Sequence, residues 1–349
     1  MNTALVIGGT GIVGRGIVES LALKPDWTII TASRSGEPVP GAHEAVSVDL
    51  LDLENAKKNL ASKVSHVTHL FYAAYLPQPS YAEEVEPNAR LLSNSIGALE
   101  ANNAPLEHVT LITGAKYYGV HLAPAPSPSH EEQPRFFGPS FYHAQEDYLR
   151  SRTDATWTWT NLIPSHLTGY AVGNPMNLAL AIGVYATLCR FAGAPLDFPG
   201  TEKSFKALTH IVDAGQLGEA ATWAAQTETA GTFNIANGDP VRWCHLWPRI
   251  AEYFGLEPGV ARPIPLAQVM TGQETAWGDI ARRDKLVSGD FEKLVNWNFL
   301  QFVFSIEFDI VLALNKISQA GFVKHFDTFE GFRQRFEQYA SARVLPKTQ

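Results

Sequence analysis

The chain has 349 residues, of which 45% are hydrophobic, 11% aromatic and 18% charged. This is enough for one large α/β domain or two lobes with a sizeable core. The formal net charge of −8, from 27 basic and 35 acidic residues, argues against a nucleic-acid-binding surface, which normally carries a basic patch.

The first half of the chain alternates apolar, strand-like segments with helical ones, and no internal repeat is evident. Continuous apolar strands between helices indicate a parallel sheet that is covered on both faces. We therefore predict a Rossmann-type, doubly wound α/β fold. The expected strands are residues 4–7, 27–32, 45–48, 69–74, 109–113 and 157–163, and the expected helices are residues 12–23, 54–61, 84–101 and 141–151.

After residue 165 the pattern loosens into helical segments at 218–225 and 245–254 and one strand at 232–236, which we expect to return to the sheet. The second half therefore predicts a smaller, discontinuous, mainly helical substrate-binding lobe. The predicted division is a Rossmann domain at residues 1–165 and about 208–240, and a substrate lobe at residues 166–207 and 241–349.

Cysteine usage and hydropathy predict the compartment. Cys189 and Cys244 lie far apart without metal-site spacing, which fits a reducing environment rather than a disulfide framework. The N-terminus runs straight into a strand-like segment, without a signal-peptide pattern. The most apolar window, residues 297–314, is interrupted by two acidic residues and is too short to span a bilayer. We interpret it as a buried or pocket-lining helix, and we expect a cytoplasmic protein with no membrane partner.

A glycine motif, GGTGIVG at residues 8–14, lies directly between the first strand and the first helix. Its spacing, Gly8-x-x-Gly11-x-x-Gly14, is typical of short-chain reductases. Glycines there permit a tight turn and a close approach to a pyrophosphate, and the helix N-terminus supplies N–H groups and a favourable dipole. In this context the motif predicts a dinucleotide site rather than a structural turn.

The second strand ends in Ser33, Arg34 and Ser35 rather than in the acidic residue that binds a ribose in NAD-dependent folds. A carboxylate would repel a 2′-phosphate, whereas an arginine can pair with it, so NADPH is favoured over NADH. Arg15 either assists or is a solvated surface charge. Asp49 either accepts a hydrogen bond from the adenine amine or caps the following helix. The other candidate cofactor contacts are Thr10, Ile12, Leu50, Ala73 and Thr113.

The segment GPSFYHAQED, residues 138–147, looks like the active-site segment of a nicotinamide-dependent reductase. The usual pattern there is Tyr-x-x-x-Lys, but Glu146 stands four residues after Tyr142. Lys116 follows strand 109–113, at the edge where open α/β folds place ligand contacts. We therefore predict that Lys116 replaces the missing lysine and lies with Tyr142 beside the nicotinamide, so both residues are candidates for catalysis and for cofactor binding.

These segments resemble the progesterone 5β-reductase / iridoid synthase group of atypical, extended short-chain dehydrogenases/reductases, within the broader NAD-dependent epimerase/dehydratase family. The resemblance covers most of the chain. It rests on TGAKYY (113–118), SFYHAQED (140–147), DFPGT (197–201), FNIANGD (233–239) and WCHLW (243–247). The chain departs from the family where Gly119 directly follows Tyr118, in the loop after it, and at His143, where many relatives have a second tyrosine.

The resemblance implies NADPH-dependent reduction of a carbon–carbon double bond conjugated to a carbonyl, in a small apolar enone or enal. It implies that Tyr142 stabilises the enolate oxygen by a hydrogen bond, and that Lys116 either lowers the pKa of Tyr142 or holds the nicotinamide ribose. A carbonyl (1,2-) reductase and a non-catalytic NADP-binding regulator remain as alternatives. A sugar-nucleotide epimerase would be expected to show Tyr-x-x-x-Lys. The oligomeric state is left as monomer or homodimer.

Several other features receive structural interpretations. The loop at 119–139 contains five prolines and is either a lid over the site or a mobile linker. The HEE triplet at 130–132 lacks the second histidine of a zinc signature, so no metal site is predicted. Trp243 and Trp247 are interpreted as packing residues. The histidines interpreted as structural are His143, His166 and His245.

Overall fold

The computed structural model describes residues 2–174, 176–287 and 290–348. The chain divides into two compact units. The first unit contains Met1–Ser165, Ala214–Ala236 and Leu312–Lys324, and the second contains His166–Asp213, Asn237–Val311 and His325–Gln349.

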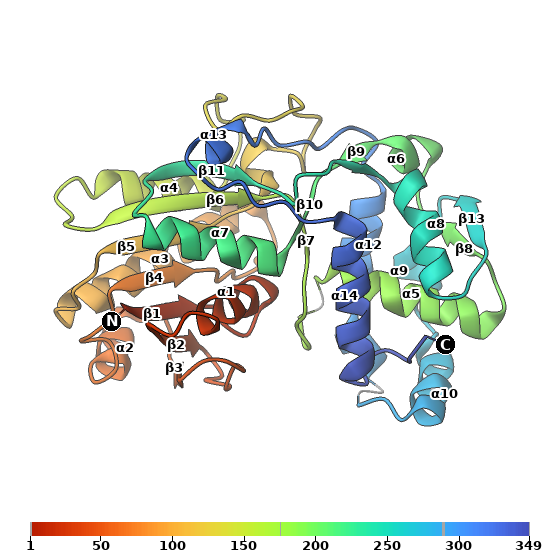
Figure 1. The fold of residues 1–349 in the computed structure, drawn as a ribbon, viewed down its shortest axis with the longest axis horizontal. Coiled ribbons are helices and arrows are strands. Elements are labelled where there is room, and N and C mark those ends of the chain that lie inside the picture. The colour runs from red at the N-terminus through yellow and green to blue at the C-terminus, as the bar shows by residue number, and fades with distance from the viewer. Residues whose placement is uncertain (1, 175, 288–289, 349) are drawn as a thin grey trace. The chain divides into compact units, whose positions relative to one another are not determined.

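The first unit is built around one parallel sheet (Figure 1). Its strands are β1 (Asn2–Ile7), β2 (Trp27–Ser33), β3 (Glu44–Ser47), β4 (His69–Tyr72), β5 (His108–Ile112), β6 (Thr158–Pro164) and β11 (Gly231–Ile235). They lie in the order β11-β6-β5-β4-β1-β2-β3, and every neighbouring pair is parallel. The predicted doubly wound fold is confirmed, and the order reverses direction between β1 and β4, where such sheets bind ligands.

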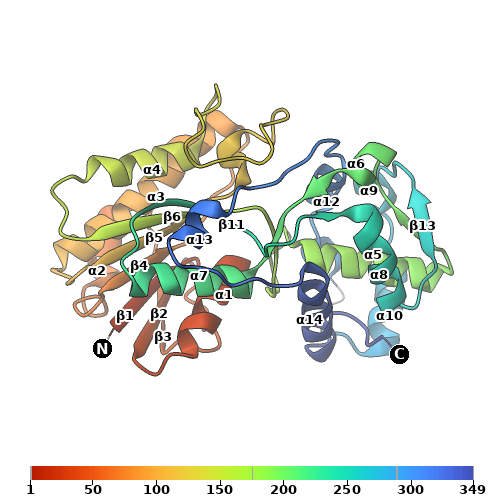
Figure 2. The ribbon, with the colours of Figure 1, turned by 45° about the horizontal axis from the view of Figure 1, so that its top comes forward.

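Helices cover both faces of this sheet, as Figure 2 shows. One face carries α1 (Ile12–Ala22) and α7 (Ala214–Gln226), and the other carries α2 (Leu53–Leu60), α3 (Tyr81–Ala101) and α4 (Phe141–Ser151). Polar N-caps fix where α2, α3 and α4 begin, because the side chains of Asp52, Ser80 and Ser140 each accept a hydrogen bond from a backbone N–H of the first turn. The unit also contains the short helices η1 (Ala115–Tyr118) and α13 (Asn315–Gln319).

The helices α1 and α7 approach each other backbone to backbone. A Cβ atom on Gly16 would lie 2.1 Å from the carbonyl oxygen of Ala214, and one on Gly218 would lie 2.1 Å from that of Gly16. Beside this contact, the hydroxyls of Ser20 and Thr222 form a hydrogen bond of 2.9 Å. The close packing therefore requires glycine at both positions.

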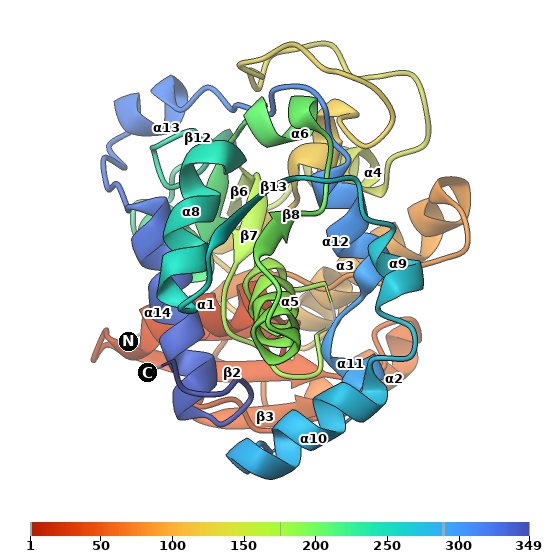
Figure 3. The same ribbon diagram turned by 90° about the vertical axis from the view of Figure 1, so that its right-hand side faces the viewer.

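The second unit is mainly helical. Its helices are α5 (Leu178–Ala192), α6 (Glu202–Lys206), α8 (Trp243–Tyr253), α9 (Leu266–Val269), α10 (Glu274–Asp284), α11 (Phe291–Leu294), α12 (Trp297–Phe304) and α14 (Thr328–Ser341). Three small sheets pair β7 (His166–Thr168) with β10 (Ile211–Asp213), β9 (Leu208–Thr209) with β12 (Val241–Arg242), and β8 (Leu196–Phe198) with β13 (Pro258–Ala261). Figure 3 shows α5 in the middle of this unit, with α14 and α12 on either side.

Aromatic side chains fill the core of the second unit. The rings of Trp243, Trp247, Phe198 and Phe304 are buried and pack with centroids 4.8–6.2 Å apart. The interpretation of the two tryptophans as packing residues is confirmed. In the described part of the chain, no helix is long and apolar enough to cross a membrane.

The structure differs from the sequence predictions in the apolar window and in the domain division, where residues 208–213 and 237–240, predicted in the Rossmann domain, fall in the second unit. The apolar window 297–314 is helical only as far as Phe304, because the following residues pair with another segment: Ile310 bridges Thr209, and Asp309 accepts a hydrogen bond from the backbone of Leu208. Residues 312–324, predicted in the substrate lobe, belong to the first unit, where Asn234 of β11 donates a hydrogen bond to the carbonyl oxygen of Ala313.

Candidate active site

The glycine loop has the shape that a pyrophosphate requires. Gly8 has a φ of +81°, and a Cβ atom there would lie 2.8 Å from the carbonyl oxygen of Ala73. A Cβ atom on Gly14 would lie 2.2 Å from the carbonyl oxygen of Gly8. Gly11 is the N-cap of α1 and has no side chain to occupy the N–H groups of the first turn. These residues therefore fit a dinucleotide phosphate held by backbone N–H groups at a helix N-terminus.

The residues around these glycines hold the loop in place. The side chain of Ile12 is buried. Nε of Arg15 donates a hydrogen bond of 3.1 Å to the carbonyl oxygen of Thr10. Arg15 is half-buried, and this hydrogen bond ties its side chain to the loop.

A shaped turn follows β2. Ser33 Oγ accepts a hydrogen bond of 3.1 Å from the backbone N–H of Gly36, and Ser47 Oγ donates one of 2.9 Å to the carbonyl oxygen of Arg34. Gly36 has a φ of +64°. The side chains of Arg34 and Ser35 remain exposed at this turn, where a group on the adenosine ribose could reach them.

Asp49 and Leu50 follow β3. Asp49 Oδ1 accepts a hydrogen bond of 2.9 Å from the backbone N–H of Leu51, so it stabilises a turn. The alternative role of Asp49 as a helix cap is wrong, because Asp52 caps α2. The side chain of Leu50 is buried, and its carbonyl oxygen accepts a hydrogen bond from Asn94. Asp49 is exposed beside this turn, which is consistent with an adenine contact.

The remaining candidate contacts lie at the ends of β4 and β5. Ala73 donates its backbone N–H to the carbonyl oxygen of Ile7, which places it beside the glycine loop. Thr113 is buried, and its hydroxyl donates a hydrogen bond of 2.8 Å to Asn161 of β6. Thr113 therefore ties β5 to β6 through both its side chain and its backbone N–H, which bonds to the carbonyl oxygen of Leu162.

Lys116 and Tyr142 line the same small pocket. Lys116 lies in η1, directly after β5, and Tyr142 lies in the first turn of α4. The pocket has room for about one water molecule. It is lined by Tyr81, Glu84, Lys116, His121, Pro139, Ser140, Phe141 and Tyr142. The prediction that a lysine from another segment joins the tyrosine agrees with this arrangement.

The hydroxyl of Tyr142 is protonated at neutral pH. Burial raises its pKa above the ordinary tyrosine value, and the nearby carboxylate of Glu84 raises it further. The net change in the pKa of Tyr142 is therefore upward, and its causes are burial and Glu84. Gly114 leaves space for the hydroxyl, since a Cβ atom there would lie 3.0 Å from Tyr142 Oη.

Glu146, which occupies the usual lysine position, is the centre of a buried network. Its carboxylate is fully buried and accepts hydrogen bonds from Tyr117 Oη at 2.6 Å, Arg135 at 2.8 Å and Arg150 at 3.2 Å. The Thr232 hydroxyl of β11 donates a further hydrogen bond. Glu146 therefore anchors η1, and with it the residue before Tyr117, which is Lys116.

The proline-rich loop at 119–139 is fastened to this network. Arg135 also forms an ion pair of 2.8 Å with Asp147. The ring of Phe136 packs on Gly119, where a Cβ atom would lie 2.9 Å from the ring and where φ is +78°. Gly119, the glycine that departs from the family spacing, therefore provides the surface on which the Phe136 ring packs. The described loop is attached to α4 and η1 rather than being a free linker.

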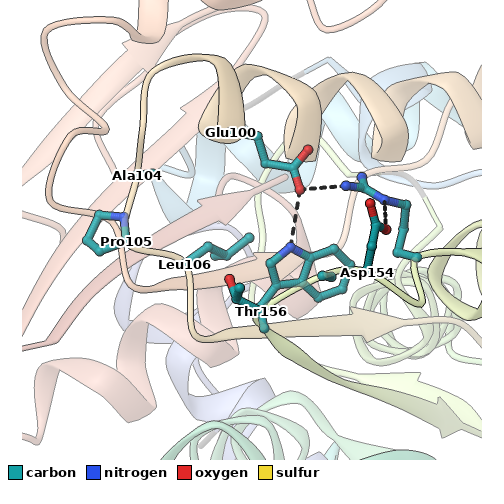
Figure 4. Close-up of a pocket in the computed structure, with 9 residues that line it drawn as sticks. Glu100, Ala104, Pro105, Leu106, Asp154 and Thr156 are labelled. Carbon is teal, nitrogen blue, oxygen red and sulfur yellow. Dashed lines mark hydrogen bonds and ion pairs between the residues drawn. The ribbon is translucent and has the colours of Figure 1, made fainter.

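A second pocket, of about 230 Å³, lies at the opposite edge of the sheet, near the beginnings of β5 and β6 (Figure 4). Glu100 on its wall accepts hydrogen bonds from Arg152 at 2.9 Å and from Trp157 at 3.3 Å. Its polar groups pair with one another and it contains neither Lys116 nor Tyr142, so we place the chemistry in the smaller pocket.

The comparison with protein families decides the relationship of the chain. Residues 39–346 match the PRISE-like Rossmann-fold domain. The chain belongs to this family. A 3-oxo-Δ(4,5)-steroid 5β-reductase from Arabidopsis thaliana is 29% identical over 99% of this chain and 93% of the relative. An (S)-8-oxocitronellyl enol synthase from Catharanthus roseus is also 29% identical, over 99% of this chain and 92% of the relative.

Solved structures agree with the fold of this PRISE-like protein. A GDP-mannoheptose C4 reductase from Campylobacter jejuni with NADP bound has a TM-score of 0.66 at 14% identity, covering 97% of this chain and 98% of its own. A UDP-N-acetylglucosamine 4-epimerase from Bacillus cereus has a TM-score of 0.66 at 17% identity, covering 100% and 99%. The family match and the full-length reductase relative confirm the expectation of an oxidoreductase of the short-chain dehydrogenase/reductase superfamily.

Sequence analysis missed three residues of the PRISE-like pocket: Tyr81, Glu84 and His121. Tyr81 and Glu84 begin α3, the helix that follows β4, so their place after a sheet strand was a usable signal. Glu84 is buried and accepts a hydrogen bond from the Tyr75 hydroxyl. His121 lies in the proline-rich loop, and no pattern in that loop identified it.

Proposed function

We propose that this PRISE-like protein catalyses NADPH-dependent 1,4-reduction of the carbon–carbon double bond of small apolar α,β-unsaturated ketones or aldehydes. The observation that carries the proposal is the shared pocket of Lys116 and Tyr142, with a glutamate anchoring the lysine-bearing turn. Relatives named as a steroid 5β-reductase and an enol synthase support the reaction class.

The cofactor would be held by residues that already have the required shape. Gly8, Gly11 and Gly14 form the cradle for its pyrophosphate. Arg34, exposed at the turn after β2, would pair with the 2′-phosphate that distinguishes NADPH from NADH. When bound, the cofactor supplies the hydride that the β-carbon of the substrate accepts.

Tyr142 would act on the carbonyl oxygen of the substrate. Negative charge develops on this oxygen when the β-carbon accepts a hydride, and a hydrogen bond from the Tyr142 hydroxyl stabilises that charge. Since burial raises the pKa of Tyr142, the hydroxyl keeps its proton and is ready to donate. Lys116 would hold the nicotinamide ribose and add positive charge to the same pocket.

The first experiment combines purified protein, NADPH and a panel of small cyclic enones and enals. It follows the absorbance of NADPH and identifies the products. We expect saturated ketones or aldehydes, and a loss of roughly 10²–10³-fold in kcat for Tyr142→Phe. Tyr148→Phe is the matched control, because Tyr148 lies on the same helix with its hydroxyl bonded to Arg152, and it should retain activity.

The product distinguishes the proposal from its alternatives. An allylic alcohol would mean that the same residues polarise a carbonyl for 1,2-reduction. Tight NADPH binding without turnover of any substrate would favour a non-catalytic NADP-binding regulator. Equal activity of wild type and Tyr142→Phe would refute the role given to the tyrosine hydroxyl.

A further inference from the structure

Lys116 has an unusual partner for a residue of an active site. Its Nζ atom lies 5.6 Å from the centroid of the Tyr81 ring. Among the residues that the structure describes, Lys116 forms no ion pair with a carboxylate, although Glu84 lines the same pocket. The ammonium group is therefore located by an aromatic face rather than by a negative charge.

Tyr81 is itself held from two sides. Ser80 caps α3, and its hydroxyl donates a hydrogen bond of 2.7 Å to the Glu83 carboxylate while accepting one from the Glu83 backbone N–H. These two hydrogen bonds fix the helical turn that carries Tyr81. On the pocket side, the His121 ring meets the Tyr81 ring edge-on, with centroids 4.8 Å apart and an interplanar angle of 85°.

His121 is compatible with a cation nearby. Burial and, after it, the charge of Lys116 together lower its pKa to about 4, so the imidazole is neutral at physiological pH. The His121 ring also makes a T-shaped contact with Phe136, the ring that packs on Gly119, with centroids 5.6 Å apart. Lys116, Tyr81, His121 and Phe136 thus form one continuous series of contacts that links α3, η1 and the proline-rich loop.

We propose that Tyr81 is a positioning residue, whose aromatic ring holds the ammonium group of Lys116 in the pocket. This inference rests on the proposed function for its consequence in catalysis, but the contact itself does not. A lysine side chain has many rotamers, and the ring face restricts them by cation–π attraction. Because 42% of the Tyr81 surface is exposed, we expect a moderate effect, roughly tenfold on kcat/KM.

The test compares Tyr81→Phe, which keeps the ring, with Tyr81→Leu, which removes it. We expect Tyr81→Phe to behave like wild type, and Tyr81→Leu to lose roughly tenfold in kcat/KM. In a Lys116→Ala background, Tyr81→Leu should cause no further loss, because the residue whose position it controls is gone. Equal losses in Tyr81→Phe and Tyr81→Leu, or a full additional loss in the Lys116→Ala background, would overturn the proposal.

A second readout needs neither cofactor nor substrate. In protein labelled with ¹³C-lysine, the Lys116 ε-CH₂ protons should show a ring-current shift in wild type and Tyr81→Phe, and lose it in Tyr81→Leu. Lys116→Arg assigns the signal. Absence of the shift in wild type would refute the contact. If wild type reduces no substrate, the proposed function fails, whereas this spectrum still decides whether Tyr81 holds Lys116.

Discussion

Replacing Glu146 by glutamine tests whether the buried network carries the stability of the site. The substitution keeps the size of the side chain and removes its charge. Tyr117, Arg135 and Arg150 would all lose the carboxylate they bind, and Arg135 would keep its ion pair with Asp147. We expect a clear loss of folding stability, together with disorder of η1.

The magnitude follows from the pKa of Glu146. Burial alone raises this pKa, but the hydrogen bonds from Thr232, Tyr117 and Arg135 outweigh burial and lower it to about 2, against an ordinary value of 4.5. This difference corresponds to about 3 kcal/mol of free energy of unfolding at neutral pH. Because the folded pKa is the lower one, the contribution is complete above about pH 4.5 and is lost as the pH falls towards 2.

Urea unfolding followed by tryptophan fluorescence measures the effect at pH 7 and at lower pH. Asp147→Asn is the matched control, because Asp147 binds the same arginine but its side chain is 57% exposed, so its loss should cost less than about 1 kcal/mol. Equal destabilisation by Glu146→Gln and Asp147→Asn, or a Glu146→Gln effect that stays constant from pH 7 to 3, would refute the reasoning.

Three further predictions concern the cofactor cradle and the sheet. Gly14→Ala should weaken NADPH binding by more than about tenfold in a fluorescence titration, whereas Gly278→Ala, where the added methyl group meets open space, should not. Equal NADPH affinities of the two variants would contradict the close packing at Gly14. Arg34→Ala should weaken NADPH binding roughly tenfold and leave NADH unchanged, and equal losses would disprove the 2′-phosphate contact. Burial lowers the pKa of His69 to about 4 and that of His108 to about 3. Protonation of these histidines therefore favours the unfolded state, and the free energy of unfolding falls as the pH drops from 6.5 towards these values. His108→Gln should make the urea midpoint fall less steeply with pH, and an unchanged slope would argue against this explanation.

The fold was largely predictable, because its signals are local. The apolar pattern predicted all seven strands of the parallel sheet, and the predicted helix 141–151 coincides with α4. The prediction of a helix over residues 297–314 was wrong after Phe304, because hydropathy does not distinguish a buried helix from a buried extended segment. In the structure, Ile310 pairs with Thr209. The assignment of residues 312–324 to the substrate lobe was wrong, because the hydrogen bond between Ala313 and Asn234 is a long-range contact that no sequence pattern reveals.

The site was predictable in its positions but not in its interactions. Lys116 and Tyr142 could be found because they follow a strand and begin a helix at the same edge of the sheet. The partners of Glu146 come from segments far apart in the chain, so no spacing could reveal them. For the same reason, the direction in which the pKa of Tyr142 changes depends on burial and on Glu84, which only the structure supplies.

The backbone contact between Gly16 and Gly218 joins segments that are synthesised far apart in time, and this affects how the first unit folds during synthesis. During synthesis, residues 2–165 emerge with the α1 face uncovered and β6 as an open edge, because α7 and β11 follow only after residue 213. Such long-range pairing is slow, and apolar surface stays exposed until α7 and β11 have been synthesised and have paired. The nascent chain must therefore carry an incomplete nucleotide-binding half through the synthesis of about fifty further residues, and a fragment cut at residue 165 should aggregate rather than bind cofactor.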